Sequence, residues 1–251
     1  RGARGALDPL LVYLQSFTGG NTYDSEGNIL INSDECLEAF KTWTDQYLNG
    51  YAPEDSINWG FTEMVDNFTG GLTGTLINDS EVLPTCEANM DPEVWGVMPM
   101  PASTKDGKIY NTINAPYAYS ISGNSEHPDE AWQLIEFMTN AENNIEYCKT
   151  TGEIPIKKDV ENDETYGTDG PYAAFVQQMN DPNLAVPTTF GPFDYTDLHQ
   201  GMFHEEIQSY LLGDIDAETA LTTITDELQT RMTAYMEEHP DTIVETALTL
   251  Q

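Results

Sequence analysis

The residues best suited to chemistry lie in one short polar run, Asn78–Glu81, at the end of a predicted strand over 73–78. Carboxylate and amide oxygens accept paired hydrogen bonds from hydroxyl groups, so Asn78, Asp79 and Glu81 are candidate ligand-binding residues. Two apolar residues precede them, and an apolar setting raises the pKa of a carboxyl group that must donate a proton. Asp79 and Glu81 are therefore also the best candidates for a catalytic pair. The competing interpretation is an ordinary polar turn.

A second candidate site is the segment 189–195, in which Phe190, Phe193 and Tyr195 stand beside a glycine and a proline. An aromatic ring can cover the apolar C–H face of a ligand ring. Such a density of aromatic residues is unusual for a solvated loop. Stacking on a ligand and packing into the core are equally good interpretations. Trp59 is a weaker candidate, because an apolar contact at the start of the helix that follows explains it as well.

Other chemical motifs are incomplete. The segment 24–35 has the length of a calcium loop, but Ile29 stands where that loop needs glycine. His204 begins an H-E-E run that lacks the second histidine of H-E-x-x-H, and the chain has no G-x-S-x-G. We therefore predict a protein with no metal, no cofactor and no enzymatic activity. A glycosidase is the alternative, since its chemistry needs only two acids at a set separation.

Charge and cysteine content exclude several classes of partner. With 43 acidic and 9 basic residues the formal charge is −34, so the chain repels nucleic acids and anionic lipid headgroups, which bind through Lys and Arg. A hydrophobic content of 39% is nevertheless enough for a folded core. Cys36, Cys86 and Cys148 have no C-x-x-C spacing, which predicts buried structural thiols. No apolar run is long enough to cross a membrane.

The elements that must position these residues follow from apolar periodicity and from glycine and proline stops. The pattern predicts helices over 33–48, 59–68, 129–138, 202–212 and 216–235, and a further helical stretch that reaches 149 and breaks at Gly152. It predicts strands over 73–78 and 94–98, an alternating stretch over 113–121, and a hairpin over 21–31. This mixture indicates an α/β fold.

The order of these segments resembles the extracellular solute-binding proteins of carbohydrate ABC importers, the maltose-binding-protein-like family. The matching parts are a helix ending at Phe68 and Gly71, a strand with the turn at Asn78, the segment Met98-Pro-Met-Pro101, the stretch 113–121, the helix from Asp129 to Met138, Gly152-x-x-Pro155, and the closing segment Gly213–Leu221. The resemblance covers nearly the whole chain, from Arg1 to about Glu238. Each part is ordinary alone, and the resemblance rests on their order.

The resemblance implies an α/β, periplasmic-binding-protein-like type II fold, mainly its second lobe with a returning segment of the first. The chain would begin near the hinge and lack most of the first lobe. Residues 1–112 would form the first part of the second lobe, 113–158 would return to the first lobe, and 159–251 would supply the closing helices and the tail. The returning segment would then expose apolar side chains, those of Tyr117, Tyr119, Trp132 and Ile135.

In this family the ligand lies in the cleft between the two lobes. The resemblance therefore implies that a monomer binds a mono- or oligosaccharide or a polyol and delivers it to the transmembrane subunits of an ABC permease. A polar residue at Glu81, where an aromatic could stand, favours a small sugar or polyol. The resemblance adds Arg4, at the crossover, and Asn114 and Tyr117, on a strand edge, to the candidate ligand-binding residues. A hinge salt bridge for Arg4 and core packing for Tyr117 are the alternatives.

The resemblance also implies an extracytoplasmic location, either as a cell-surface lipoprotein or in the periplasm. We expect the export signal to be absent from this chain. A secreted glycosidase and a glycan-adhesion module are the alternative functions. Polar turns and aromatic loops occur in binding proteins of importers, in glycosidases and in adhesion modules alike.

Overall fold

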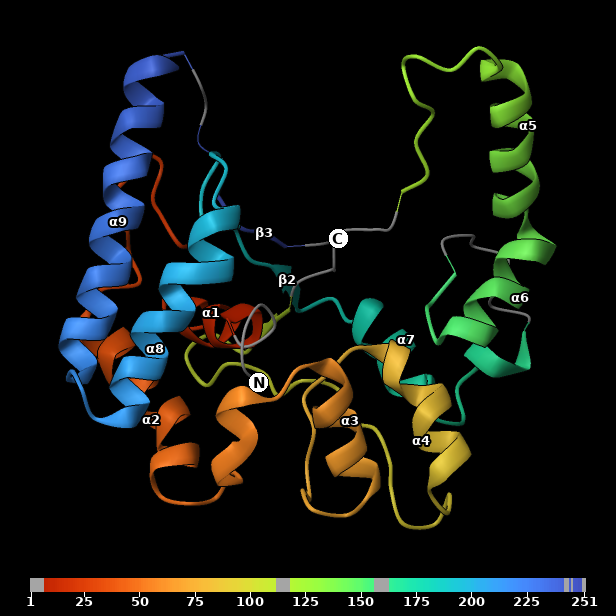
Figure 1. Cartoon of the computed structure of the whole chain (residues 1–251), viewed down its shortest axis with the longest axis horizontal. Coiled ribbons are helices and arrows are strands. Elements are labelled where there is room, and N and C mark those ends of the chain that lie inside the picture. Colours follow the sequence, from red (N-terminus) through yellow and green to blue (C-terminus); the bar gives the residue numbers. More distant parts are fainter. Residues whose placement is uncertain (1–6, 112–117, 156–162, 242–243, 245, 250–251) are drawn as a thin grey trace. The chain divides into compact units, whose positions relative to one another are not determined.

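The computed structural model describes residues 7–111, 118–155, 163–241, 244 and 246–249, and most of its regular structure is helical (Figure 1). The helices are α1 (Leu7–Gln15), α2 (Asp34–Leu48), α3 (Phe61–Thr69), α4 (Leu83–Asn89), α5 (Pro128–Thr139), α6 (Ala141–Thr151), α7 (Ala173–Met179), α8 (Phe203–Leu212) and α9 (Ala217–Glu238). The short helical turns are η2 (Glu54–Asn58), η3 (Ser80–Val82), η5 (Glu164–Tyr166) and η6 (Leu198–Met202), and the strands are β1 (Ile109–Tyr110), β2 (Leu184–Val186) and β3 (Leu248–Thr249).

Local signals explain where the main helices begin and end. Ser33, Asn140 and Asp216 each accept a hydrogen bond from a backbone N–H of the first turn, and so cap α2, α6 and α9. Helices α6 and α8 end at Gly152 and Gly213, both in the left-handed conformation at φ 85°, which costs glycine no steric penalty. The helices predicted over 33–48, 59–68, 129–138, 202–212 and 216–235 are confirmed within a few residues.

The strands differ from those that the sequence predicts. Strand β1 pairs in parallel with β2, and β2 pairs antiparallel with β3. The predicted hairpin is confirmed in reduced form, as a bridge between Tyr23 and Ile29. The strands predicted over 73–78 and 94–98 are wrong, because those segments form no ladder with any described residue. Of the stretch 113–121, residues 113–117 lie outside the described part and 118–121 form no strand. Alternation alone supplies no pairing partner, and a strand needs one.

Residue contacts divide the chain into two compact units. Unit 1 comprises Arg1–Leu76, Met100–Thr112 and Pro182–Gln251, and unit 2 comprises Ile77–Pro99 and Ile113–Asp181. The lobe boundaries expected at 112/113 and 158/159 stay a prediction.

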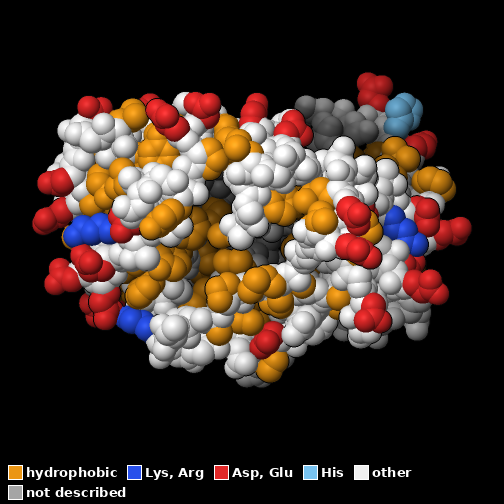
Figure 2. All heavy atoms as spheres, turned by 90° about the horizontal axis from the view of Figure 1, so that it is seen from below, with side chains coloured by type: hydrophobic (Ala, Val, Ile, Leu, Met, Phe, Trp, Pro, Cys, Tyr) orange, Lys and Arg blue, Asp and Glu red, His pale blue; other side chains and the backbone are white. Residues whose placement is uncertain are grey.

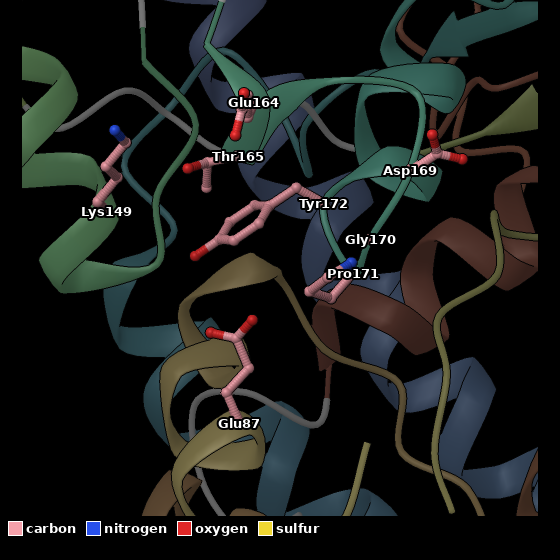
Figure 3. Close-up of a pocket in the computed structure, with 8 residues that line it drawn as sticks. All are labelled: Glu87, Lys149, Glu164, Thr165, Asp169, Gly170, Pro171 and Tyr172. Carbon is pink, nitrogen blue, oxygen red and sulfur yellow. The ribbon is translucent and has the colours of Figure 1, made fainter. Parts of the chain in front are cut away.

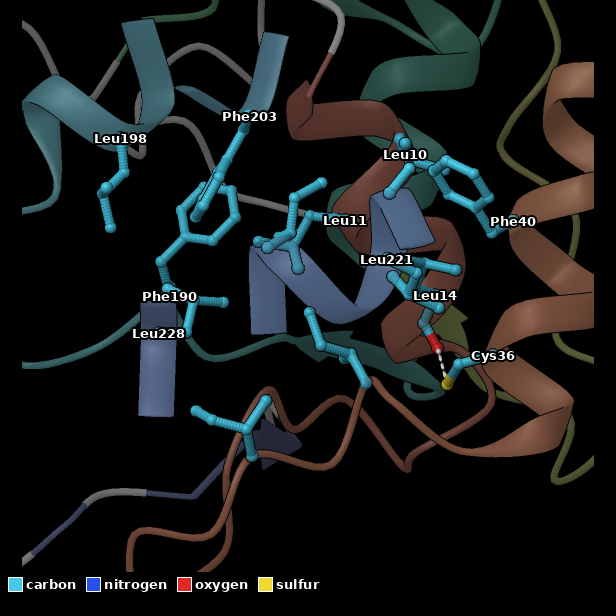
Figure 4. Packing of buried hydrophobic residues seen from close by; sticks show 14 of the residues in the cluster. Leu10, Leu11, Leu14, Cys36, Phe40, Phe190, Leu198, Phe203, Leu221 and Leu228 are labelled. Atoms are coloured by element: carbon cyan, nitrogen blue, oxygen red, sulfur yellow. Dashed lines mark hydrogen bonds between the residues drawn. The ribbon is translucent and has the colours of Figure 1, made fainter. Parts of the chain in front are cut away.

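The core of unit 1 is formed by α1, α2, α8 and α9 (Figure 4). Phe40 of α2, Phe203 of α8 and Leu228 of α9 are fully buried there. Gln229 ties α9 to the hairpin, since its Oε1 accepts a hydrogen bond from the Ile29 N–H at 2.9 Å and its Nε2 donates to the Gly27 carbonyl at 3.1 Å. The amphipathic helices therefore bury one common apolar face.

Unit 2 has a smaller core, built from Leu83, Cys148, Tyr166 and Tyr172. All three cysteines of the chain are buried free thiols, as predicted. Helix α5 has no buried residue.

The exposure that the resemblance implies for this region is confirmed for Tyr119 and Trp132, whose exposed fractions are 49% and 54%. Ile135 is half-buried. Tyr117 lies outside the described residues.

The surface carries the acidic excess of the composition. On the face shown in Figure 2, carboxylates are scattered over the surface and Lys and Arg side chains are sparse. Within the described ranges, no helix combines the length and the apolarity needed to cross a membrane.

Candidate functional site

The polar run Asn78–Glu81 forms a tight turn that leads into α4 in unit 2. The Asn78 side-chain oxygen accepts a hydrogen bond from the Asp79 N–H at 3.0 Å. Asp79 caps η3, and its carboxylate accepts from the Glu81 N–H at 3.2 Å. The side-chain nitrogen of Asn78 is buried and has no hydrogen-bond partner among the described residues. The turn thus offers carboxylate oxygens, and it holds one buried amide donor without a described partner.

The end of helix α6 is packed directly against this turn. A Cβ atom added at Gly152 would lie 2.7 Å from the Ser80 carbonyl oxygen and 2.9 Å from the Glu81 Cα. Such distances are too short for any residue with a side chain. Glycine is therefore required here both for its left-handed backbone and for the close approach of the two segments.

This contact brings Glu153 to the turn. Burial is the main factor that raises the pKa of Glu153 above its usual value, and the charges of Glu81 and Asp79 raise it further. The pKa of Tyr147 on α6 is raised mainly by the charge of Glu153 and secondly by burial. Tyr119 and Glu81 raise it further. Among described residues, no Lys or Arg forms an ion pair with Asp79, Glu81 or Glu153.

The arrangement is rich in acceptors and poor in donors. Three carboxylates without a described cation can be satisfied by hydroxyl donors, each of which gives a charge-assisted hydrogen bond. Tyr147 is 46% exposed beside them and offers an aromatic face. A polyhydroxylated ligand would supply the missing donors and the apolar C–H face together.

The aromatic segment 189–195 belongs to unit 1 and mostly faces inward. Phe190 is 4% exposed, and its ring centroid lies 5.2 Å from those of both Phe203 and Tyr195 (Figure 4). Phe193 covers Gly191, where a Cβ would collide with the Phe193 ring. Phe193 and Tyr195 are half-buried against the core. Packing is the role that the structure shows for Phe190, while Phe193 and Tyr195 keep some ring surface accessible.

The remaining predicted residues lie in the other unit or outside the described residues. Trp59 is half-buried in unit 1, at the end of η2, whereas Asn78, Asp79 and Glu81 are in unit 2. Arg4, Asn114 and Tyr117 lie outside the described residues. Sequence reasoning missed Glu153 and Tyr147. The motif Gly152-x-x-Pro155 could have indicated Glu153, because the glycine that ends α6 also places the next residue beside the turn.

The chain matches the family described as bacterial extracellular solute-binding protein over residues 3–174. Since this is more than half of its length, the chain belongs to that family. No curated protein matches it. The described fold is consistent with part of the periplasmic-binding-protein-like α/β fold, and the solved structures below carry that fold.

Three solved structures of sugar-binding proteins are similar to the chain. Maltose-bound MalE3 of T. maritima is 22% identical with a TM-score of 0.72, and the match covers 92% of this chain and 59% of that one. The sugar-binding protein MalE of Xanthomonas citri is 15% identical with a TM-score of 0.68, over 96% and 59%. A solute-binding protein of Thermotoga lettingae bound with α-D-tagatose is 18% identical with a TM-score of 0.68, over 92% and 59%. The chain therefore spans about three fifths of the length of these structures.

Proposed function

We propose that this chain is the carbohydrate-binding component of an ABC importer, which captures a sugar or polyol outside the cytoplasm and delivers it to a membrane permease. The observation that carries the proposal is the meeting of Asp79, Glu81 and Glu153 at one turn, where no described cation satisfies them. Carboxylates in such a setting bind hydroxyl groups well. Family membership supports a solute-binding role.

We assign Asn78, Asp79 and Glu81 to the ligand, and add Glu153 and Tyr147. Phe193 and Tyr195 stay proposed stacking residues, and so does Trp59. The protein acts as a monomer, without catalysis and without a cofactor. Export as a lipoprotein or to the periplasm belongs to the same proposal.

The test measures the binding of a panel of neutral sugars and polyols to the parent chain and to three variants. Ligand-observed NMR detects the binding. Asp79→Asn removes the charge but keeps a good helix cap. Glu153→Gln removes the charge that burial disfavours. Glu136→Gln on α5 is the matched control, because Glu136 is exposed and the charge change is the same.

Because the chain spans about three fifths of the length of its structural relatives, we expect at least one sugar or polyol to bind, but only weakly. A lost hydrogen bond to a charged group weakens binding by roughly ten- to hundredfold, so Asp79→Asn and Glu153→Gln should bind much more weakly than Glu136→Gln. No binding by any member of the panel would overturn the carbohydrate assignment. Equal binding by all variants would remove this turn from the site.

A glycosidase is the second candidate, and one observation favours it. Glu153 has a raised pKa next to two further carboxylates, which is the setting of a general acid beside a second acidic group. Release of nitrophenol from nitrophenyl glycosides that is lost in Glu153→Gln would establish this function. Binding without turnover would leave the importer component as the function.

A further inference from the structure

Unit 2 contains a pocket that shares no lining residue with the turn at Asn78–Glu81. Its volume is about 380 Å³, and its walls come from α4, α6, η5 and the segment before α7 (Figure 3). Its charged and aromatic lining residues are Glu87, Lys149, Glu164, Asp169 and Tyr172.

Tyr172 reaches from the core of unit 2 into this pocket. The residue is 2% exposed, and its ring packs edge-on against Tyr166 with centroids 5.1 Å apart. Figure 3 shows its hydroxyl end directed between Lys149 and Glu87. No described residue forms a hydrogen bond with that hydroxyl. The Tyr172 side chain is thus almost wholly buried, while its unpaired hydroxyl opens onto the pocket and is available to a ligand bound there.

The charges around the hydroxyl favour a cation. Lys149 forms an ion pair with Asp163 at 2.7 Å and a longer one with Glu146 at 3.8 Å, so its charge is already neutralised. Glu87, Glu164 and Asp169 form no ion pair with any described residue and leave the pocket negative. Burial raises the pKa of Tyr172, and Glu87 raises it further, so the phenol stays neutral and accepts a hydrogen bond.

The geometry disfavours a bare metal ion as the ligand. A metal ion needs several oxygen ligands at short range, and no group of three acidic, His or Cys side chains among the described residues converges closely enough to hold one. A larger cation whose hydrogen-bond donors are spread out fits carboxylates that stand on different walls of the pocket.

We propose that this pocket binds a small organic cation with a primary ammonium group, which donates hydrogen bonds to the Glu87 carboxylate and to the Tyr172 hydroxyl. The remaining carboxylates favour a second positive group on the same molecule. This site is independent of the carbohydrate proposal, and neither requires the other.

The test is calorimetric titration of the chain with putrescine, a diamine, and with 1,4-butanediol, its uncharged counterpart of the same length. Both titrations are made near physiological salt, where long-range attraction to an acidic surface is largely screened. Tyr172→Phe removes the hydroxyl but keeps the buried ring. Glu87→Gln removes one exposed carboxylate, and Glu136→Gln is the control with the same charge change elsewhere in unit 2.

We expect saturable binding of putrescine at one site and no binding of the diol. Loss of either hydrogen bond should weaken putrescine binding about tenfold, while Glu136→Gln binds as the parent does. Non-saturable heats, or equal affinity in Tyr172→Phe and the parent, would overturn the proposal. Circular dichroism of each variant establishes that the fold is retained.

Discussion

Replacing Gly152 by alanine tests whether the end of α6 holds the acidic turn in place. Two costs follow from the structure. The left-handed conformation at φ 85° costs a residue with a Cβ about 1–2 kcal/mol. The new Cβ would also lie 2.7 Å from both the Ser80 carbonyl oxygen and the Pro84 Cδ, and overpacking of this kind costs about 1–3 kcal/mol. The expected loss of unfolding free energy is therefore about 2–5 kcal/mol.

Gly170 provides the matched control in the same unit. It has φ 88°, and a Cβ added there meets no described atom within 4 Å. Gly170→Ala should therefore cost only the conformational part, about 1–2 kcal/mol. The difference between the two variants isolates the contact between α6 and the turn.

The assay is urea unfolding followed by circular dichroism and by tryptophan fluorescence, with free energies from linear extrapolation. Gly152→Ala should show the lower transition midpoint of the two variants. Equal midpoints for Gly152→Ala and Gly170→Ala would refute the close packing of Gly152 on Ser80. Equal midpoints would also contradict the explanation that the packing of Gly152 places Glu153 beside Asp79 and Glu81.

Two further predictions concern single side chains. The raised pKa of Glu153 means that its protonated form contributes stability below the ordinary value of 4.5, and that this stability is lost as the pH rises through the raised pKa. The Glu153→Gln variant should therefore have a higher melting temperature than the parent at neutral pH, and the two melting temperatures should converge in acid. A lower melting temperature for the variant at neutral pH would contradict burial as the cause of the raised pKa. Gln229→Leu leaves the Ile29 N–H and the Gly27 carbonyl unpaired and should cost about 1–3 kcal/mol, whereas Gln229→Glu keeps the acceptor and should lose less. Chemical unfolding of the two Gln229 variants decides this, and equal losses would rule out separate roles for the two hydrogen bonds.

The helices could be predicted because their causes are local. A helical hydrogen bond joins residues four apart, and caps such as Ser33 and Asp216 act within one turn. Apolar periodicity, caps and glycine stops therefore located α2, α5, α8 and α9. The strands could not be predicted in the same way. Ile109 pairs with Leu184, a residue far along the chain, and the alternating segment 73–78 has no pairing partner among the described residues.

The amino-acid sequence by itself determined the acidic character of the chain, its main helices, its family resemblance, and the choice of Asn78, Asp79 and Glu81 as candidate site residues. Only the tertiary structure decided which groups stand beside that turn. Glu153 reaches it because Gly152 lets two backbones approach closely. Tyr172 and Glu87 line the same pocket because α4, α6 and the segment before α7 surround it. Contacts of this kind depend on packing between distant segments, and neither the type of a residue nor its spacing records them.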